Sequence, residues 1–179
     1  MNIKPVAFIP LLVLVAIGLL FAVGLRNDPK RMPSVLIDRQ MPDFVLEPVL
    51  TGQEVFQPSD LLGRVSLVNV FGSWCAACMQ EHPTLMRLAR QNRIAIYGVD
   101  WRDTAEAGAA WLAKNGNPYT KVGLDAHSKL AIDLGVTGAP ETYLVDNKGR
   151  IRFKQIGPIT DQVWRQTIEP IVLKLEAQP

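Results

Sequence analysis

The longest apolar run of the chain lies close to its amino terminus. Residues 6–25 (VAFIPLLVLVAIGLLFAVGL) contain no charged side chain. At ~1.5 Å per residue, a helix of this length reaches across a hydrocarbon core of ~30 Å. Pro10 falls in the first turns, where a helix in lipid tolerates it. The pattern therefore predicts an amino-terminal membrane anchor within residues 1–25.

A cleaved signal peptide is the alternative for this segment. Its apolar core is shorter, roughly 7–15 residues, and small residues follow it, which Ala22-Val23-Gly24 imitates. The length of the run favours an uncleaved anchor. Basic residues on both sides leave the orientation weakly determined, with an excess after the segment that argues for a cytoplasmic domain. The cysteine chemistry described below outweighs this and favours the periplasmic side.

Beyond the anchor, residues 26–40 are polar and contain two prolines, which is typical of a linker. Residues 41–179 then alternate strand and helix patterns. The expected strands are 44–47, 54–57, 65–71, 94–99, 142–146 and 151–156, and the expected helices are 59–63, 75–91, 104–114, 128–134 and one that begins at 160 and runs past 170. The first two strands form a small hairpin, and 65–71 reads as a strand buried on both faces.

This order is a βαβ half followed by a ββα half, preceded by the hairpin as an amino-terminal extension. A strand followed by Cys-x-x-Cys and a helix is the signature of the thioredoxin fold. We therefore expect an α/β domain with a central mixed sheet flanked by helices.

The two cysteines of the chain carry the strongest chemical signal. Cys75 and Cys78 follow the buried strand 65–71 and open the next helix, in the run Trp74-Cys75-Ala76-Ala77-Cys78. The free N–H groups and the dipole at a helix start stabilise a thiolate. Such a thiolate attacks a substrate disulfide, and a second cysteine one turn later resolves the mixed disulfide. We expect Cys75 to be the nucleophile and Cys78 the resolving residue, with no cofactor beyond this redox-active disulfide.

Other uses of the two cysteines are weaker. A zinc site needs four ligands, whereas Cys75, Cys78 and His82 offer three along one helix. Haem attachment requires histidine after the second cysteine, and Met79 stands there. A metal chaperone that uses these three ligands nevertheless remains the alternative from a different functional class. The near balance of 19 basic and 17 acidic residues, without a basic run, argues against nucleic acid as a partner.

A second motif, Gly138-Ala139-Pro140-Glu141-Thr142, lies where a strand begins. An X-Pro bond at a strand entrance after a glycine-containing loop is a candidate cis peptide. In the thioredoxin fold this proline faces the Cys-x-x-Cys motif across a groove. The backbone of the preceding residue is then available to an extended substrate.

Three segments together resemble one family. FGSWCAACMQEHPTL, YGVDWRD and GVTGAPETYLVD are similar to the CcmG/DsbE family, periplasmic thiol–disulfide oxidoreductases of cytochrome c maturation. The resemblance extends over essentially the whole chain, including the anchor and a helix inserted after the second central strand. It implies a protein of the inner membrane that keeps apocytochrome c thiols reduced before haem attachment. It also implies a membrane thiol transporter of the DsbD or CcdA type as electron donor.

The resemblance assigns the cis-proline to Pro140 and makes Glu81 and Glu141 an acidic surround of the active site. Nearby carboxylates raise thiol pKa values and select partners by charge. For Glu81, a solvated helix residue is the other interpretation. Trp74 either shields the cysteine pair and contacts partners or serves in packing.

Two further points bear on the reaction. Asp100 and Asp103 end the second central strand and could edge the same groove, but we expect neither to be catalytic. The Ala76-Ala77 dipeptide departs from relatives that often have proline first, so the redox potential stays open although we expect a reducing direction. A reductase of the same fold for another extracytoplasmic client, such as a copper-centre or spore protein, is the neighbouring alternative.

Overall fold

The computed structural model describes residues 9–24 and 36–177. The chain divides into two units, Met1–Pro33 and Ser34–Pro179. The first contains one helix, α1 (Ile9–Gly24), of 16 residues. Among the described residues, no helix combines the length and apolar character that a membrane crossing requires. Residues 1–8 and 25 of the predicted anchor, and 26–35 of the predicted linker, lie outside the described residues.

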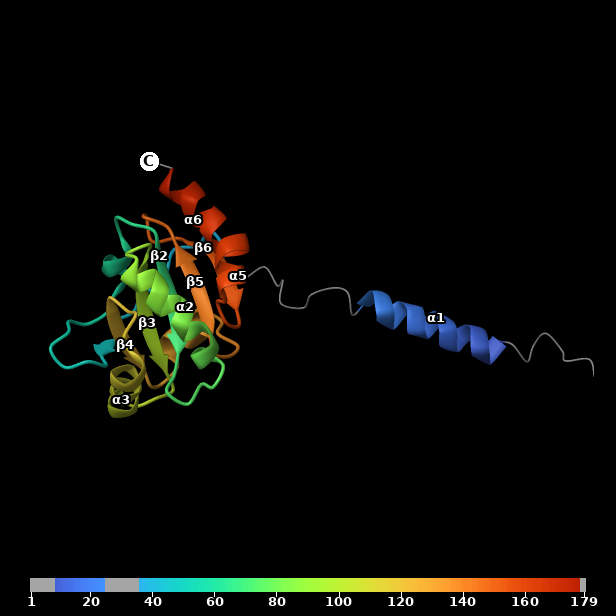
Figure 1. Ribbon diagram of the computed structural model, residues 1–179, viewed down its shortest axis with the longest axis horizontal. Coiled ribbons are helices and arrows are strands. Elements are labelled where there is room, and N and C mark those ends of the chain that lie inside the picture. Colours follow the sequence, from blue (N-terminus) through green and yellow to red (C-terminus); the bar gives the residue numbers. More distant parts are fainter. Residues whose placement is uncertain (1–8, 25–35, 178–179) are drawn as a thin grey trace, which may run out of the picture. The chain divides into compact units, whose positions relative to one another are not determined.

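A six-stranded mixed sheet forms the centre of the second unit, in the order β1-β4-β3-β2-β5-β6 (Figure 1). Strands β2, β3 and β4 are parallel, whereas β1, β5 and β6 pair antiparallel with their neighbours. The strands are β1 (Glu47–Pro48), β2 (Ser66–Phe71), β3 (Ala95–Trp101), β4 (Lys121–Asp125), β5 (Glu141–Val145) and β6 (Ile151–Ile156).

Helices surround this sheet. They are the 3₁₀ turn η2 (Pro58–Leu61), α2 (Cys78–Arg90), α3 (Ala105–Asn115), α4 (Lys129–Asp133), and a terminal helix of α5 (Asp161–Val163), the π-helical turn η3 (Trp164–Ile168) and α6 (Glu169–Glu176). The amide of Glu169 donates to the carbonyl of Trp164, five residues earlier, immediately before Pro170, which has no amide hydrogen to donate.

Two apolar layers hold the unit together. On one face of the sheet, α2, α3 and the terminal helix bury a cluster that includes both cysteines and Trp164. On the other face, α4 and the segment before β2 cover a second cluster that includes Phe56 and Tyr143. Strand β2 is buried along its whole length, as predicted from its continuous apolar pattern.

Three expectations need correction. Strand β4 was not predicted, because its five residues include Gly123 and two charged ends. A Cβ at Gly123 would collide with Leu46, so glycine permits the close approach of the segment before β1. The predicted hairpin of 44–47 and 54–57 is reduced to one antiparallel bridge between Leu46 and Phe56. Helix α2 begins at Cys78 and not at Cys75.

Residues 36–40, expected to belong to the linker, bind the start of β6. The amide of Asp38 donates to the carbonyl of Ile151 at 2.7 Å, and the amide of Ile151 donates to the carbonyl of Arg39 at 2.9 Å. Ile37 packs against the second apolar cluster. The folded unit therefore includes these residues.

The strand register gathers the chemically interesting segments at one end of the sheet. Phe71 at the end of β2 pairs with Asp100 in β3, and Val70 pairs with Glu141 at the start of β5. The Cys-x-x-Cys loop, the residues after β3 and the loop before β5 therefore emerge at the same edge.

Candidate active site

Cys75 and Cys78 form a disulfide, with their Cα atoms 5.3 Å apart. Cys75 lies in the turn before α2, where its amide donates to the carbonyl of Gly72 at 3.0 Å. The amide of Cys78 donates to the Cys75 sulfur at 3.1 Å. A backbone donor directed at Sγ stabilises negative charge on that sulfur when the disulfide is reduced. The arrangement favours Cys75 over Cys78 as the thiolate.

Trp74 lies beside the disulfide with about half of its surface exposed, 52 %. Its indole Nε1 donates to the carbonyl of Trp101 at 3.1 Å, and the two rings meet edge to face. A Cβ at Gly72 would fall within 2.6 Å of that Nε1, so glycine is required beneath the ring. Trp74 thus packs on the end of β3 and also presents apolar surface to solvent, as does Met79.

Glu81 is buried, with 1 % of its surface exposed, so the interpretation as a solvated helix residue is wrong. Its Oε1 accepts from Asn69 Nδ2 at 2.8 Å, and its Oε2 accepts from the amide of Ile159 at 2.9 Å. Burial raises the pKa of Glu81 to about 7, although both hydrogen bonds act in the opposite direction. Glu81 follows Cys78 by one turn on the buried face of α2, so it supplies a proton-exchanging group near neutrality on that face.

A chain of buried side chains extends from Glu81 across the sheet. Asn69 on β2 also donates to Thr142 Oγ1 at 2.9 Å, and its Oδ1 accepts from the Tyr119 hydroxyl at 2.7 Å. These contacts fix the orientation of the Asn69 amide, with its NH₂ toward Glu81. Burial raises the pKa of Tyr119 far above its usual value, so the hydroxyl stays a donor. Sequence reasoning missed Asn69 and Tyr119 because their partners are distant along the chain.

Glu141 does not lie among the groups beside the disulfide. Its side chain shares a face of β5 with Tyr143, which belongs to the second apolar cluster. There its carboxylate forms an ion pair with Lys154 at 2.9 Å and accepts from the amide of Thr137 at 3.0 Å. The charge of Glu141 is thus compensated on the face opposite the cysteines.

The bond between Ala139 and Pro140 is cis, as predicted. Pro140 is buried, and its carbonyl accepts from the amide of Gly157 at 2.9 Å. Ala139 packs against the apolar cluster that contains both cysteines. The proline loop and the Cys-x-x-Cys loop are therefore neighbours at the same edge of the sheet.

Asp100 and Asp103 also lie at this edge. Asp100 is fully buried, whereas Asp103 Oδ2 accepts from the amide of Ser73 at 2.6 Å, next to Trp74. Burial, assisted by the nearby charge of Asp103, raises the pKa of Asp100 to about 8. For Asp103, burial raises the pKa, but the hydrogen bonds from Ser73, Thr104 and Asp100 together outweigh it and lower the pKa. The two carboxyl groups therefore differ in charge at neutral pH.

His82 faces α3 and not the solvent in front of the cysteines. Its Nε2 lies 3.1 Å from the carbonyl of Asn115, and its ring meets Trp111 edge to face. Burial lowers the pKa of His82 below its usual value. The residue connects α2 to the inserted helix.

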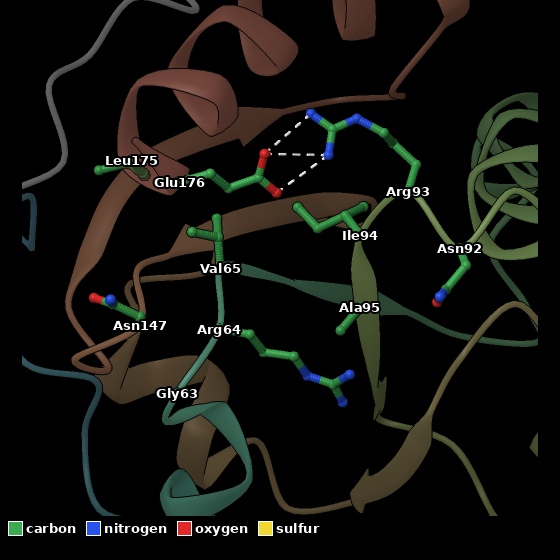
Figure 2. A pocket seen from close by; sticks show the side chains of 10 residues that line it. All are labelled: Gly63, Arg64, Val65, Asn92, Arg93, Ile94, Ala95, Asn147, Leu175 and Glu176. Atoms are coloured by element: carbon green, nitrogen blue, oxygen red, sulfur yellow. Dashed lines mark hydrogen bonds and ion pairs between the residues drawn. The ribbon is translucent and has the colours of Figure 1, made fainter. Parts of the chain in front are cut away.

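A hollow of about 390 Å³ lies at the opposite end of β2 and β3, lined by residues of 63–65, 92–95, 147 and 175–176 (Figure 2). Arg93 in its wall is paired with Glu176 at 3.1 Å, as Figure 2 shows. Arg64 donates to the Tyr97 hydroxyl at 2.9 Å. Because it adjoins the start of β2, this hollow is separated from the disulfide by the length of the strand.

Comparisons with known proteins agree with this geometry. The redoxin family model matches residues 37–168. The thiol:disulfide interchange protein DsbE of Allochromatium vinosum is 44 % identical over 95 % of this chain and 94 % of its own. The thiol:disulfide interchange protein HelX of Rhodobacter capsulatus is 42 % identical over 94 % of this chain and 96 % of its own.

A solved structure supports the fold. The secreted thiol-disulfide isomerase of Corynebacterium glutamicum superposes with a TM-score of 0.66, at 21 % identity, over 82 % of this chain and 95 % of that one. The thioredoxin-like architecture expected from the sequence is thereby confirmed. With a Cys-x-x-Cys disulfide at the start of α2 and relatives of this identity over nearly the full length, the chain belongs to the DsbE family of thiol–disulfide oxidoreductases.

Proposed function

We propose that this chain reduces disulfides in apocytochrome c, or in a maturation partner that holds it, before haem is attached. The observation that carries the proposal is the Cys75 sulfur in front of α2, where the Cys78 amide donates to it. The family resemblance supplies the client. A haem-binding segment contains Cys-x-x-Cys-His, and both of its thiols must be reduced for attachment.

In the proposed reaction the Cys75 thiolate attacks one sulfur of the substrate disulfide. A mixed disulfide forms between Cys75 and that sulfur, and the other substrate sulfur leaves as a thiolate. Cys78, once deprotonated, attacks the Cys75 sulfur and releases the second substrate thiolate, which leaves the Cys75–Cys78 disulfide. Glu81, with a pKa of about 7, is the group that accepts the Cys78 proton in this scheme. Two electrons pass from the dithiol to the substrate.

Acidic groups around the cysteine loop support a reducing direction. A strongly oxidising protein of this fold has a stabilised thiolate and therefore a stabilised reduced form. Glu81 on α2, which is partly ionised near neutrality, and the ionised Asp103 beside Ser73 place negative charge around the cysteine loop. They oppose a thiolate and so favour transfer of electrons to the client.

The edge of the sheet also supports a protein client. Trp74 and Met79 are exposed apolar side chains next to the disulfide. The loop that carries the cis bond before Pro140 lies at the same edge and offers backbone to an extended peptide. Exposed apolar side chains beside available backbone suit an extended polypeptide segment such as that of an apocytochrome.

We infer that the catalytic domain works in the periplasm, held at the inner membrane by a single-pass anchor. The uncharged run 6–25 supports the anchor, and the family resemblance supports its orientation. The same resemblance points to a membrane thiol transporter of the DsbD or CcdA type as electron donor. Oxidised Cys75–Cys78 would be the form that this donor recognises.

Equilibration with glutathione tests the direction. The protein is incubated in buffers of defined ratio of reduced to oxidised glutathione, and the fraction of free Cys75 and Cys78 is measured by alkylation. We expect a potential close to that of thioredoxin, about −270 mV. A value near that of a dedicated disulfide-forming oxidant, about −120 mV, would contradict the proposal.

A further inference from the structure

Asp100 is the least compensated buried group of the described residues near the site. None of its surface is exposed, and neither carboxyl oxygen accepts a hydrogen bond from the described part of the chain. The neighbouring helix α3 places Gly108 directly over it, where a Cβ would collide with Oδ2. An ionised carboxylate without donors is costly to bury. The group is therefore satisfied by keeping its own proton and donating it.

Asp103 is the acceptor for that proton. The two side chains interact by a hydrogen bond that favours the protonated form of Asp100 and the ionised form of Asp103. Asp103 in turn accepts from two amides, that of Ser73 at 2.6 Å and that of Thr104 at 2.9 Å. Its carboxylate thereby joins the first turn before α3 to the loop that carries Cys75.

The end of β3 holds this loop at a second point. The Trp101 carbonyl accepts from the Trp74 indole at 3.1 Å, and the indole rests on Gly72. Ser73 and Trp74 are thus each tied to the segment after β3, directly before the nucleophile. If Asp103 lost its orientation, the Ser73 amide would lose its partner and the loop one of its two ties.

We propose that Asp100 and Asp103 form a carboxylic acid–carboxylate pair that positions the loop of Cys75, with Asp103 holding the Ser73 amide and protonated Asp100 holding Asp103. Both are positioning residues, since neither touches the reacting sulfurs in this scheme. The proposal rests on the assignment of Cys75 as the nucleophile. When Asp100 ionises, its carboxylate and that of Asp103 repel each other, and this repulsion loosens the loop of Cys75.

Other titratable groups share the cluster that faces Asp100. Tyr119, from the loop after α3, interacts with Asp100 electrostatically and stays protonated. Helix α2 contributes Cys78, Glu81 and His82, and the turn before it contributes Cys75. The pKa of Asp100 is about 8 and that of Glu81 about 7, so the two carboxyls titrate at neighbouring pH values. In the oxidised protein the cysteines do not titrate, which removes them from the measurement.

The test follows the Ser73 amide by nuclear magnetic resonance in the oxidised full-length chain labelled at serine nitrogen, with Ser73→Ala to assign the signal. We expect a strongly hydrogen-bonded proton whose shift changes between pH 7 and pH 9 as Asp100 ionises. Asp100→Asn, which is neutral and retains a donor, should keep the signal and abolish the change. Asp100→Leu should move the signal toward that of a free amide at every pH. Because this readout needs no activity, it stands apart from the proposed client and direction.

Kinetics supply a second readout. The reduced protein reacts with dithiobis-nitrobenzoate, and the rate is measured at pH 7. Loss of one hydrogen bond corresponds to about a fivefold change in rate. We therefore expect Asp100→Leu to react about fivefold more slowly than the parent, and Asp100→Asn to react at a rate within about twofold of it. If Asp100→Leu left both the Ser73 signal and the rate unchanged, the pair would not position the loop. If the Ser73 change persisted in Asp100→Asn but vanished in Glu81→Gln, Glu81 would be its source and the proposal would fail.

Discussion

The environment of Glu81 reverses the usual effect of a carboxyl group on how the free energy of unfolding changes with pH. Its folded pKa of about 7 lies above the ordinary value of 4.5. Between these values the folded state binds more protons than the unfolded state, so the free energy of unfolding falls as pH rises. The contribution is complete below about pH 4.5 and lost by about pH 7. Such a group is retained at a cost in stability, which is expected of a residue with a chemical role.

Replacing Glu81 by glutamine should flatten this pH dependence. The shift corresponds to about 3 kcal/mol between pH 4.5 and pH 7, so that part of the decline should disappear in Glu81→Gln. Urea unfolding of the oxidised protein across this range measures it. The matched control is Glu106→Gln, at an exposed position of α3. An unchanged difference between parent and Glu81→Gln at all pH values would show that Glu81 does not titrate in this window.

At the scale of secondary-structure elements, the sequence predicted those helices and strands whose formation depends on residues close together in the chain. The continuous apolar run predicted β2, and helices were expected from residues 104 and 160, where the Thr104 and Thr160 side chains cap α3 and the terminal helix by accepting from backbone amides. The sequence pattern did not predict β4, because its pairing with β3, and not its composition, makes this segment a strand.

The same limit applies to the candidate site, where the sequence predicted short motifs but not contacts between distant segments. The cysteines and the cis bond follow from short motifs. The burial of Glu81 depends on Asn69 and Ile159, and the neutralisation of Glu141 depends on Lys154. These partners come from other strands and loops, so a single sequence without a fold does not reveal them.

The packing of α3 against Asp100 yields a prediction at this scale. Alanine is favoured over glycine in an exposed helix by about 1 kcal/mol. At Gly108 the added methyl group would collide with Asp100, and overpacking of this kind costs about 1–3 kcal/mol. We therefore expect Gly108→Ala to lower the free energy of unfolding, measured in urea. Ala110→Gly, at an exposed position of the same helix, reports propensity alone. A gain in stability for Gly108→Ala would mean that α3 does not press on the acid pair.

At the scale of the whole molecule, the folded unit begins before the residue expected from composition. The residues 36–40 add backbone hydrogen bonds to the start of β6, and Arg152 forms an ion pair with Asp38 at 2.9 Å. The boundary was placed late because a short polar segment resembles a linker when the strand that it joins is unknown. This attachment fixes where a soluble catalytic fragment has to start.

Two truncated chains test the boundary. A fragment of 36–179 keeps the contacts of Asp38 and Arg39 with Ile151, whereas a fragment of 41–179 lacks them. We expect the shorter fragment to be less stable by about 1–3 kcal/mol, from lost hydrogen bonds and the lost burial of Ile37. Urea unfolding of both fragments at one pH gives the difference. Equal stabilities within about 0.5 kcal/mol, the scale of an ordinary surface change, would place 36–40 outside the folded unit.

Covalent trapping distinguishes the attacking cysteine, Cys75, from the resolving cysteine, Cys78. Cys78→Ser is expressed in membranes, and covalent adducts are identified after non-reducing electrophoresis. We expect mixed disulfides through Cys75 that disappear with reductant, with apocytochrome c or a maturation partner among the trapped proteins, and no adducts with Cys75→Ser. Adducts that accumulated with Cys75→Ser and not with Cys78→Ser would contradict the account, because the attacking sulfur would then be that of Cys78.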